Sequence, residues 1–293
     1  PLRPWRAAPW AVAILALCAV ALAQPPSPGA YGRPRLLAML ANPHVTESSG
    51  IAVSRRHERV LWTHNDSGDA ARLYAFDLEG RDLGAWQVEG AVNRDWEDLA
   101  SVQMDGQSWL VVSDTGDNLG WRAECALYLV PEPDVHEPAQ GPRVAKGALT
   151  LRFRYEDGAR DCEALAVDIP ARTIYLIEKT SRPVSQVYAL AWPQTQPAEV
   201  AVARKAGQAP ISLATAADMS PDGLRLAVGA LKAAVEFERA PGETWPQALA
   251  RPPRPLPAPR RKQGESICYA WDTRTLYMTS EGSPAPLWVV PWR

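Results

Sequence analysis

One stretch of the sequence decides the fold: residues 97–117 read EDLASVQMDGQSWLVVSDTGD. An acidic residue opens a short apolar run, Met-Asp-Gly-Gln supplies a turn, and a second apolar run ends in polar residues. Apolar runs rich in Val and aromatic residues on either side of an Asp-Gly pair are typical of a β-hairpin. The stretch therefore predicts two antiparallel strands, with an acid at the start of the first.

The same plan occurs five times along the chain. The acids that open the copies are Glu47, Glu97, Glu163, Asp218 and Glu265. Their spacing, about 45 to 65 residues, is roughly that of a four-stranded propeller blade. We therefore expect an all-β fold, a β-propeller of five four-stranded blades. Six blades is the alternative, with the extra blade in 97–163 or in 231–262.

The two ends of the chain predict how the ring closes. The fifth copy is followed by Pro286–Val290 and is too short for a full blade. The apolar run Arg35–Leu40 precedes the first acid and is expected to supply the missing outer strand. Pairing the two ends removes an open sheet edge, which would otherwise favour aggregation. We interpret the Pro- and Arg-rich stretch 239–262 as an exposed loop.

The N-terminal region predicts export. Arg3 and Arg6 precede an apolar run, 11–23, that is short for a membrane span and ends in a small-x-small pattern. We expect a signal peptide at 1–23, a flexible lead-in at 24–34 and a single propeller domain at 35–293. The mature protein is expected to be secreted or periplasmic, monomeric and without a stable membrane span.

Composition excludes some classes of partner. The net charge of -2 over 293 residues gives no basic face for nucleic acid. Three cysteines remain after the expected cleavage, so at least one has no disulfide partner within the chain. They are Cys125, Cys162 and Cys268, and their spacing matches no zinc pattern.

The five opening acids predict a cation site. The innermost strand of each propeller blade lines a central channel, so acids that open these strands gather at one mouth. Carboxylates this close repel one another unless a cation compensates them, and Ca²⁺ suits a set of oxygen ligands. The alternative is structural, with each carboxylate accepting backbone N–H groups of the next blade. Both interpretations stay open from the sequence.

A second polar group follows the second strands. Its metal candidates are Asp114, Asp117 and Glu281. Its catalytic candidates, together with the preceding Arg94, are His64 as general base, Asp66, Arg94 as a clamp for an anionic group, and Lys179. Asp, Asn and Gly also form ordinary turns, and Arg and Lys also form internal ion pairs. These structural roles are the alternative.

Several motifs together resemble a known group of proteins. They are ESSGIA, LWTHNDSG, NRDWEDLA, SDTGDN, DCEALAVD, AADMSPDG and QGESICY…LYMTSEG, spread over roughly 45–290. This pattern resembles secreted bacterial propellers described as phytase-like or esterase-like. The resemblance implies a propeller fold and, by similarity to propeller phytases, the use of Ca²⁺ with acidic and basic residues. The basic residues near the motifs are Arg94, Arg122 and Lys179.

Two functions follow as hypotheses. The first is a Ca²⁺-dependent hydrolase of phosphoesters or simple esters, favoured by the concentration of polar residues at the channel. The second is a non-catalytic extracytoplasmic module that binds a small molecule or an envelope partner, such as a carbohydrate or peptide, at the channel mouth. The absence of a G-x-S-x-G elbow, a P-loop and an H-E-x-x-H motif favours the second.

Overall fold

The structure is a computed structural model that describes residues 29–138 and 141–293. Strands dominate it, and the one helix among the described residues is α1 (Trp245–Leu249). The predicted all-β class is confirmed. The expected signal peptide, 1–23, lies outside the described residues. No helix in the described part has the length and apolar character needed to cross a membrane.

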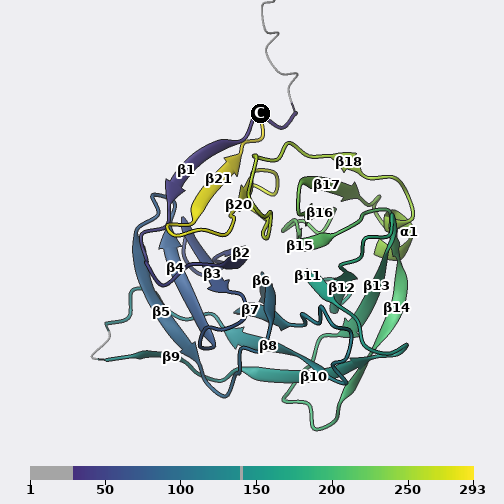
Figure 1. Ribbon diagram of the computed structural model, residues 1–293, viewed down its shortest axis with the longest axis horizontal. Coiled ribbons are helices and arrows are strands. Elements are labelled where there is room, and N and C mark those ends of the chain that lie inside the picture. The colour runs from purple at the N-terminus through teal and green to yellow at the C-terminus, as the bar shows by residue number, and fades with distance from the viewer. Residues whose placement is uncertain (1–28, 139–140) are drawn as a thin grey trace, which may run out of the picture.

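The strands are arranged as a propeller-like ring (Figure 1). The first sheet contains β2 (Ser48–Val53), β3 (Val60–Asn65), β4 (Arg72–Asp77), β5 (Asp82–Val88) and β9 (Arg143–Ala145). Another sheet contains β15 (Ala214–Met219), β16 (Arg225–Ala230), β17 (Ala233–Glu238) and β18 (Arg254–Pro255). Neighbouring strands in each are antiparallel, except that β9 runs parallel to β5.

Between these two lies an eight-stranded sheet made of two antiparallel groups. One group is β6 (Trp96–Met104), β7 (Gln107–Asp114), β8 (Cys125–Pro131) and β10 (Leu149–Tyr155). The other is β11 (Cys162–Asp168), β12 (Thr173–Glu178), β13 (Ser185–Ala191) and β14 (Ala201–Ala209). Parallel pairing of β10 with β14 joins the groups at their outer edges. The interval 97–163 thus contains the strands of the first of these groups, β6, β7, β8 and β10, together with β9 of the first sheet.

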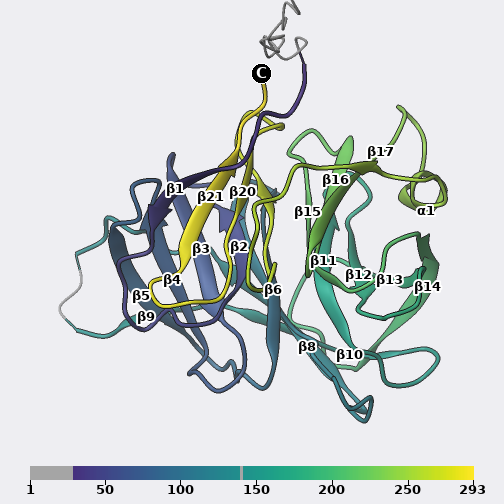
Figure 2. The same cartoon turned by 45° about the horizontal axis from the view of Figure 1, so that its top comes forward.

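The predicted closure across the two ends of the chain is confirmed. The last sheet contains β19 (Cys268–Tyr269), β20 (Leu276–Met278), β21 (Pro286–Val290) and β1 (Arg35–Met39). β1 pairs antiparallel with β21, and a bridge between Tyr31 and Trp292 extends the contact. The two strands lie side by side in Figure 2. The early strand therefore covers an edge that β21 would otherwise expose.

The inner strands β2, β6, β11, β15 and β19 pack against one another around the centre of the ring (Figure 1). Side-chain hydroxyl groups donate across the junction between β2 and β6. Ser49 Oγ donates to the carbonyl of Glu97 at 2.7 Å, and Ser101 Oγ donates to the carbonyl of Val53 at 2.5 Å. Buried carbonyls at this junction are thereby paired, which a closed ring of short strands requires.

A bulge recurs at the start of four inner strands. The register shifts between Ser48 and Ile51 in β2, and between Trp96 and Leu99 in β6. The equivalent shifts lie between 162 and 164 in β11 and between 214 and 216 in β15. A bulge inserts one extra residue and re-aims side chains that strict alternation would send elsewhere. In β6 and β11 the inserted positions include Glu97 and Glu163.

Hydrophobic side chains fill the space between neighbouring sheets. Trp62 and Trp96 are completely buried, one in the first sheet and one at the start of β6. Cys125, Cys162 and Cys268 are buried free thiols. Among the described residues the cysteines therefore act as small core side chains, which a core of this size accommodates without a disulfide.

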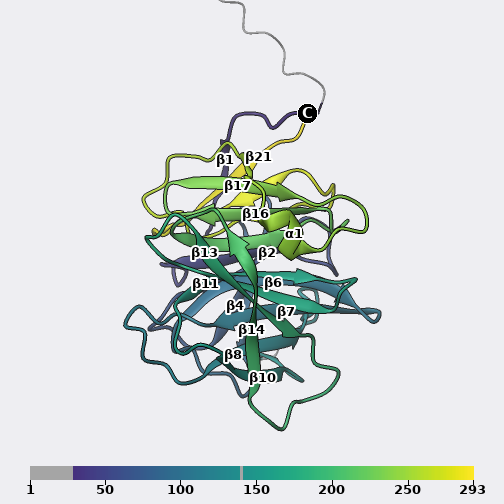
Figure 3. The same cartoon turned by 90° about the vertical axis from the view of Figure 1, so that its right-hand side faces the viewer.

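The stretch 239–262 differs from the expected exposed loop. It contains α1 and β18, and α1 lies on the rim of the ring against β14 and β17 (Figure 3). The backbone N–H of Thr244 donates to Gln247 Oε1 at 3.0 Å, and Pro246 occupies the first turn, so the helix start is stabilised locally. Burial of Trp245 and Leu249 stabilises this short helix, although the surrounding sequence is rich in proline.

Candidate functional site

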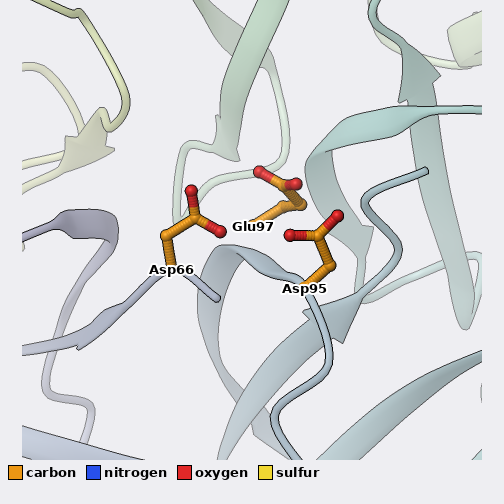
Figure 4. Close-up of side chains that lie close together, drawn as sticks. All are labelled: Asp66, Asp95 and Glu97. Atoms are coloured by element: carbon orange, nitrogen blue, oxygen red, sulfur yellow. The ribbon is translucent and has the colours of Figure 1, made fainter. Parts of the chain in front are cut away.

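Carboxylates converge at the mouth of the ring where the inner strands begin. Asp66 follows β3, Asp95 precedes β6, and Glu97 is the second residue of β6. One oxygen from each lies within 4.8 Å of the other two. Figure 4 shows the three side chains pointing toward one another. Antiparallel pairing places the end of β3 beside the start of β2, and the packing of β2 against β6 then brings Asp66 to Asp95 and Glu97.

A second group of acids adjoins the first and shares Glu97. Asp161 precedes β11 and Glu163 is its second residue, and one oxygen from each lies within 4.8 Å of a Glu97 oxygen and of the other. Both strands thus begin with Asp-x-Glu. We call the five residues together the acidic mouth: Asp66, Asp95, Glu97, Asp161 and Glu163.

Gly116 makes the close approach of these side chains possible. A methyl group at this position would overlap Glu97 Oε1 and Asp95 Oδ2. The loop is fixed around it, since the N–H of Gly116 donates to the carbonyl of Asp95 at 3.2 Å. Absence of a side chain at residue 116 therefore leaves the space in which the two carboxylates face one another.

Four carboxyl groups of the acidic mouth have a raised pKa: Asp95, Glu97, Asp161 and Glu163. Burial, reinforced by the charges of Glu163, Asp66 and Asp95, raises the pKa of Glu97 well above its usual value. Burial and the neighbouring Asp66 raise the pKa of Asp95 to about 6. Burial also raises the pKa of Asp161, although an N–H from Asp117 opposes this. The site thus holds more negative charge than its own surroundings compensate.

Lys179 compensates one side of the acidic mouth. Its Nζ donates to Glu163 Oε1. Burial still raises the pKa of Glu163 to about 8, while Lys179 opposes the increase. Burial lowers the pKa of Lys179, but Glu163 and Glu97 outweigh it and the net shift is upward. The other carboxylate oxygen, Glu163 Oε2, is buried without a hydrogen-bond partner among the described residues. The single ammonium group of Lys179 therefore pairs with only part of the acidic mouth.

Two predicted metal residues lie nearby. Burial and the charges of Glu281 and Asp66 raise the pKa of Glu265, while Lys179 opposes the shift, so its carboxyl group faces the same mouth. Glu281 accepts a hydrogen bond from Gln263. Neither belongs to the two close groups of acids. We therefore place Glu265 and Glu281 at the border of the acidic mouth.

Four of the residues predicted to bind metal lie outside the acidic mouth. Glu47 has an exposed side chain and belongs to neither close group of acids. Asp114 forms a buried ion pair with Arg122 at 2.8 Å, and Asp117 accepts the N–H groups of Trp121 and Arg122.

Asp218 lies at the other end of its strand from the bulge of β15. Its Oδ2 accepts the N–H of Tyr269 in the next inner strand at 2.8 Å. Asp114, Asp117 and Asp218 therefore form internal ion pairs or hydrogen bonds, as the structural alternative predicts. In β15 the bulge position that corresponds to Glu163 is occupied by Thr215.

The catalytic candidates are separated by the fold. His64 is fully buried, its Nδ1 lies 2.9 Å from the carbonyl of Asn65, and its Nε2 has no partner among the described residues. Burial lowers the pKa of His64, and the imidazole packs against Trp96 in the core. Arg94 is exposed beside the site. Only Asp66 and Lys179 come into the acidic mouth itself.

The sequence interpretation missed Asp95 and Asp161. The signal was available as the repeated Asp-x-Glu at 95–97 and 161–163. Strict alternation along an extended strand places the first and third residues of such a motif on one face. The extra residue of each bulge sits inside this motif, so the convergence required the register as well as the spacing.

Comparison with known proteins gives limited information. No family model matches the sequence, and no curated protein matches it. A chain of the mitotic checkpoint complex is similar over 82% of this chain and 63% of its own length, with 12% identity and a TM-score of 0.38. An auxiliary nutrient binding protein from Bacteroides thetaiotaomicron is similar over 84% of this chain and 69% of its own, with 7% identity and a TM-score of 0.48. At these values neither protein informs the function of this chain.

Proposed function

We propose that the protein is a secreted or periplasmic five-bladed propeller that binds Ca²⁺ at the acidic mouth and holds a small-molecule or envelope ligand there. The observation that carries the proposal is the convergence of Asp66, Asp95 and Glu97 within 4.8 Å. Ca²⁺ binds oxygen at about 2.3–2.6 Å, so two oxygens on one ion lie at most about 5 Å apart. The observed spacing is therefore compatible with three carboxylates on one ion.

Two further features favour a bound cation over a purely structural role for these carboxylates. Gly116 lets the carboxylates of Glu97 and Asp95 approach each other so closely that a methyl group at this position would overlap both. Glu163 Oε2, beside this group, is buried without a partner among the described residues, so Lys179 alone does not satisfy the adjoining carboxylates. Lys179 already binds the Glu163 side, so we place the ion at Asp66, Asp95 and Glu97, with Asp161 and Glu163 behind them.

Binding is the function that the site supports best. The predicted general base His64 is fully buried, and Lys179 is engaged with Glu163. A bound Ca²⁺ would supply a positive centre for anionic or hydroxyl-bearing ligands. In this proposal Lys179 keeps Glu163 oriented, and exposed Arg94 contributes positive charge at the border.

Hydrolysis of phosphoesters or simple esters is the second candidate. It is favoured by the presence of carboxylates and an ammonium group at one mouth, together with the resemblance to phytase-like propellers. A panel of phosphate-ester and carboxylate-ester substrates, assayed with Ca²⁺ and with chelator, separates the two functions. Turnover that requires Ca²⁺ and is lost in Glu97→Gln would establish the hydrolase, whereas Ca²⁺ binding without turnover supports the binding module.

Calcium is expected to stabilise the mature protein. An ion that binds only the folded state at 100 times its dissociation constant adds about 2.7 kcal/mol. For a chain of this size the melting temperature should rise by roughly 5–10 °C. Thermal unfolding followed by circular dichroism in Ca²⁺ and in chelator measures the shift. A melting temperature that is the same in both would contradict the proposed site and leave the carboxylates as structural groups.

Replacing Gly116 by alanine should weaken Ca²⁺ binding without removing a ligand. The new methyl group has to displace Glu97 Oε1 and Asp95 Oδ2, so at least about a tenfold loss of affinity is expected, or roughly 1.4 kcal/mol. Isothermal titration calorimetry gives the affinity. Gly106→Ala is unsuitable as a control because of its positive φ, whereas Gly141→Ala meets no atom within 4 Å and should bind Ca²⁺ normally.

A further inference from the structure

A pocket lies at the opposite mouth of the ring. The inner strands begin at the acidic mouth, and the pocket is lined by residues at and beyond their other ends, such as Arg55 after β2, Val102 in β6, Ile169 after β11 and Trp271 after β19. Its volume is about 450 Å³. It is thus large enough for a small organic molecule, and none of the five residues of the acidic mouth lines it.

The walls of this pocket are mainly apolar. Trp271 contributes an indole that is 50% exposed, which is unusual for so large an apolar side chain in a folded domain. Val167 and Met219 are buried in the wall, with Ile169 partly exposed beside them. An apolar molecule or ring would gain free energy by covering these groups.

One cationic group in the wall has unused hydrogen-bonding capacity. Arg55 Nε donates to the carbonyl of Ser101 at 3.3 Å, and the guanidinium lies 6.0 Å from the centre of the Trp271 ring. Arg55 Nη1 is buried without a partner, and the side chain forms no ion pair with the residues that the structure describes. A buried unpaired N–H group is rare and marks a position where an acceptor is expected.

The acids near Arg55 limit the charge of that acceptor. Asp222 is engaged with Arg225, and Asp218 accepts the N–H of Tyr269. Burial raises the pKa of Asp218 to about 7 although Arg55 opposes the shift, so this carboxyl group is partly neutral at neutral pH. A multiply charged anion such as a phosphate dianion would meet repulsion here, whereas a single carboxylate matches the planar guanidinium.

We infer that this mouth is a second binding site, for a small organic monocarboxylate whose carboxylate accepts hydrogen bonds from Arg55 and whose apolar body packs against Trp271. The two features that carry the inference are the unpaired Nη1 and the exposed indole in one pocket. The site does not depend on the proposed Ca²⁺ centre, because the two occupy opposite mouths of the ring.

Titration of the mature protein with benzoate tests the inference. Calorimetry should detect saturable binding of one benzoate per chain, equal in Ca²⁺ and in chelator. Benzyl alcohol, which keeps the ring and loses the charge, and inorganic phosphate, which keeps a charge and loses the ring, should each bind at least tenfold more weakly. No benzoate binding, or equal binding of benzyl alcohol or of phosphate, would overturn the inference.

Variants identify the residues. Arg55→Gln and Trp271→Ala should each weaken benzoate binding at least tenfold. Arg56→Gln is the matched control, because Arg56 is exposed, pairs with Asp134 and lies outside this pocket, so binding should stay unchanged. Trp271 is half exposed, so its replacement leaves the protein folded even if Arg55→Gln does not. Unchanged benzoate binding in Trp271→Ala would contradict the assignment.

Discussion

Replacing Asp98 by alanine is expected to lower the free energy of unfolding by about 3–5 kcal/mol. Asp98 is completely buried next to the acidic mouth. Its Oδ2 accepts the N–H groups of Leu165 and Ala217, each at 2.8 Å, and its Oδ1 accepts the N–H of Leu99 at 2.8 Å. One carboxyl group thus joins β6, β11 and β15, and its removal leaves three buried donors unpaired.

Chemical denaturation measures this loss, with Glu124→Ala as control. Glu124 has an exposed carboxylate paired with Arg152, and such pairs contribute less than about 1 kcal/mol. Asp98→Asn keeps one acceptor oxygen and should lie between wild type and Asp98→Ala. A loss below about 1 kcal/mol in Asp98→Ala would mean that water replaces the carboxyl group and that Asp98 does not hold the inner strands together.

Replacing Glu97 by glutamine is expected to abolish most of the stabilisation by Ca²⁺. Glu97 is shared by both close groups of acids, so its loss affects every proposed arrangement of ligands. The dissociation constant should rise about 100-fold, equivalent to roughly 2.7 kcal/mol. In chelator the order of stability should reverse, and Glu97→Gln should be at least as stable as the wild-type protein. The reason is that glutamine replaces a carboxyl group whose ionised form is disfavoured by burial and by the charges of Glu163, Asp66 and Asp95.

Thermal unfolding of both proteins in Ca²⁺ and in chelator tests this reversal of the order of stability. Glu47→Gln is the matched control, because Glu47 opens the same motif in the first copy but has an exposed side chain. Its response to Ca²⁺ should equal that of wild type. A Glu97→Gln protein that still gains full stability from Ca²⁺ would place the ion elsewhere and remove Glu97 from the proposed site.

The sequence by itself determined the strands and their order. Alternation of apolar and polar residues, with turn residues between them, is a local property and was sufficient to locate β2, β6, β11 and β15. It also identified β1 as the strand that completes the last sheet, because the fifth copy is short and a free edge is costly. Glu97 and Glu163 were found because they occupy the same position in two copies.

Only the tertiary structure decided which polar side chains meet. A bulge adds one residue to a strand, and a shift of one residue turns a side chain to the opposite face. The bulges of β6 and β11 contain Glu97 and Glu163, which lie in the acidic mouth, whereas the bulge of β2 lies between Ser48 and Ile51 and contains no acid. The five acids open similar sequence motifs, so only the register shows which of them occupy a bulge.

The sequence likewise did not show which side chains would contact one another. Asp114 lies beside Arg122, and His64 packs against Trp96 with ring centres 5.4 Å apart, so neither is available to a ligand at the mouth. Asp66 and Asp161 come from separate copies of the repeat and meet around Glu97 only because the ring brings neighbouring strands together. Strand formation depends on near neighbours in the chain, whereas this site depends on side chains far apart in sequence that closure of the ring places within a few ångströms.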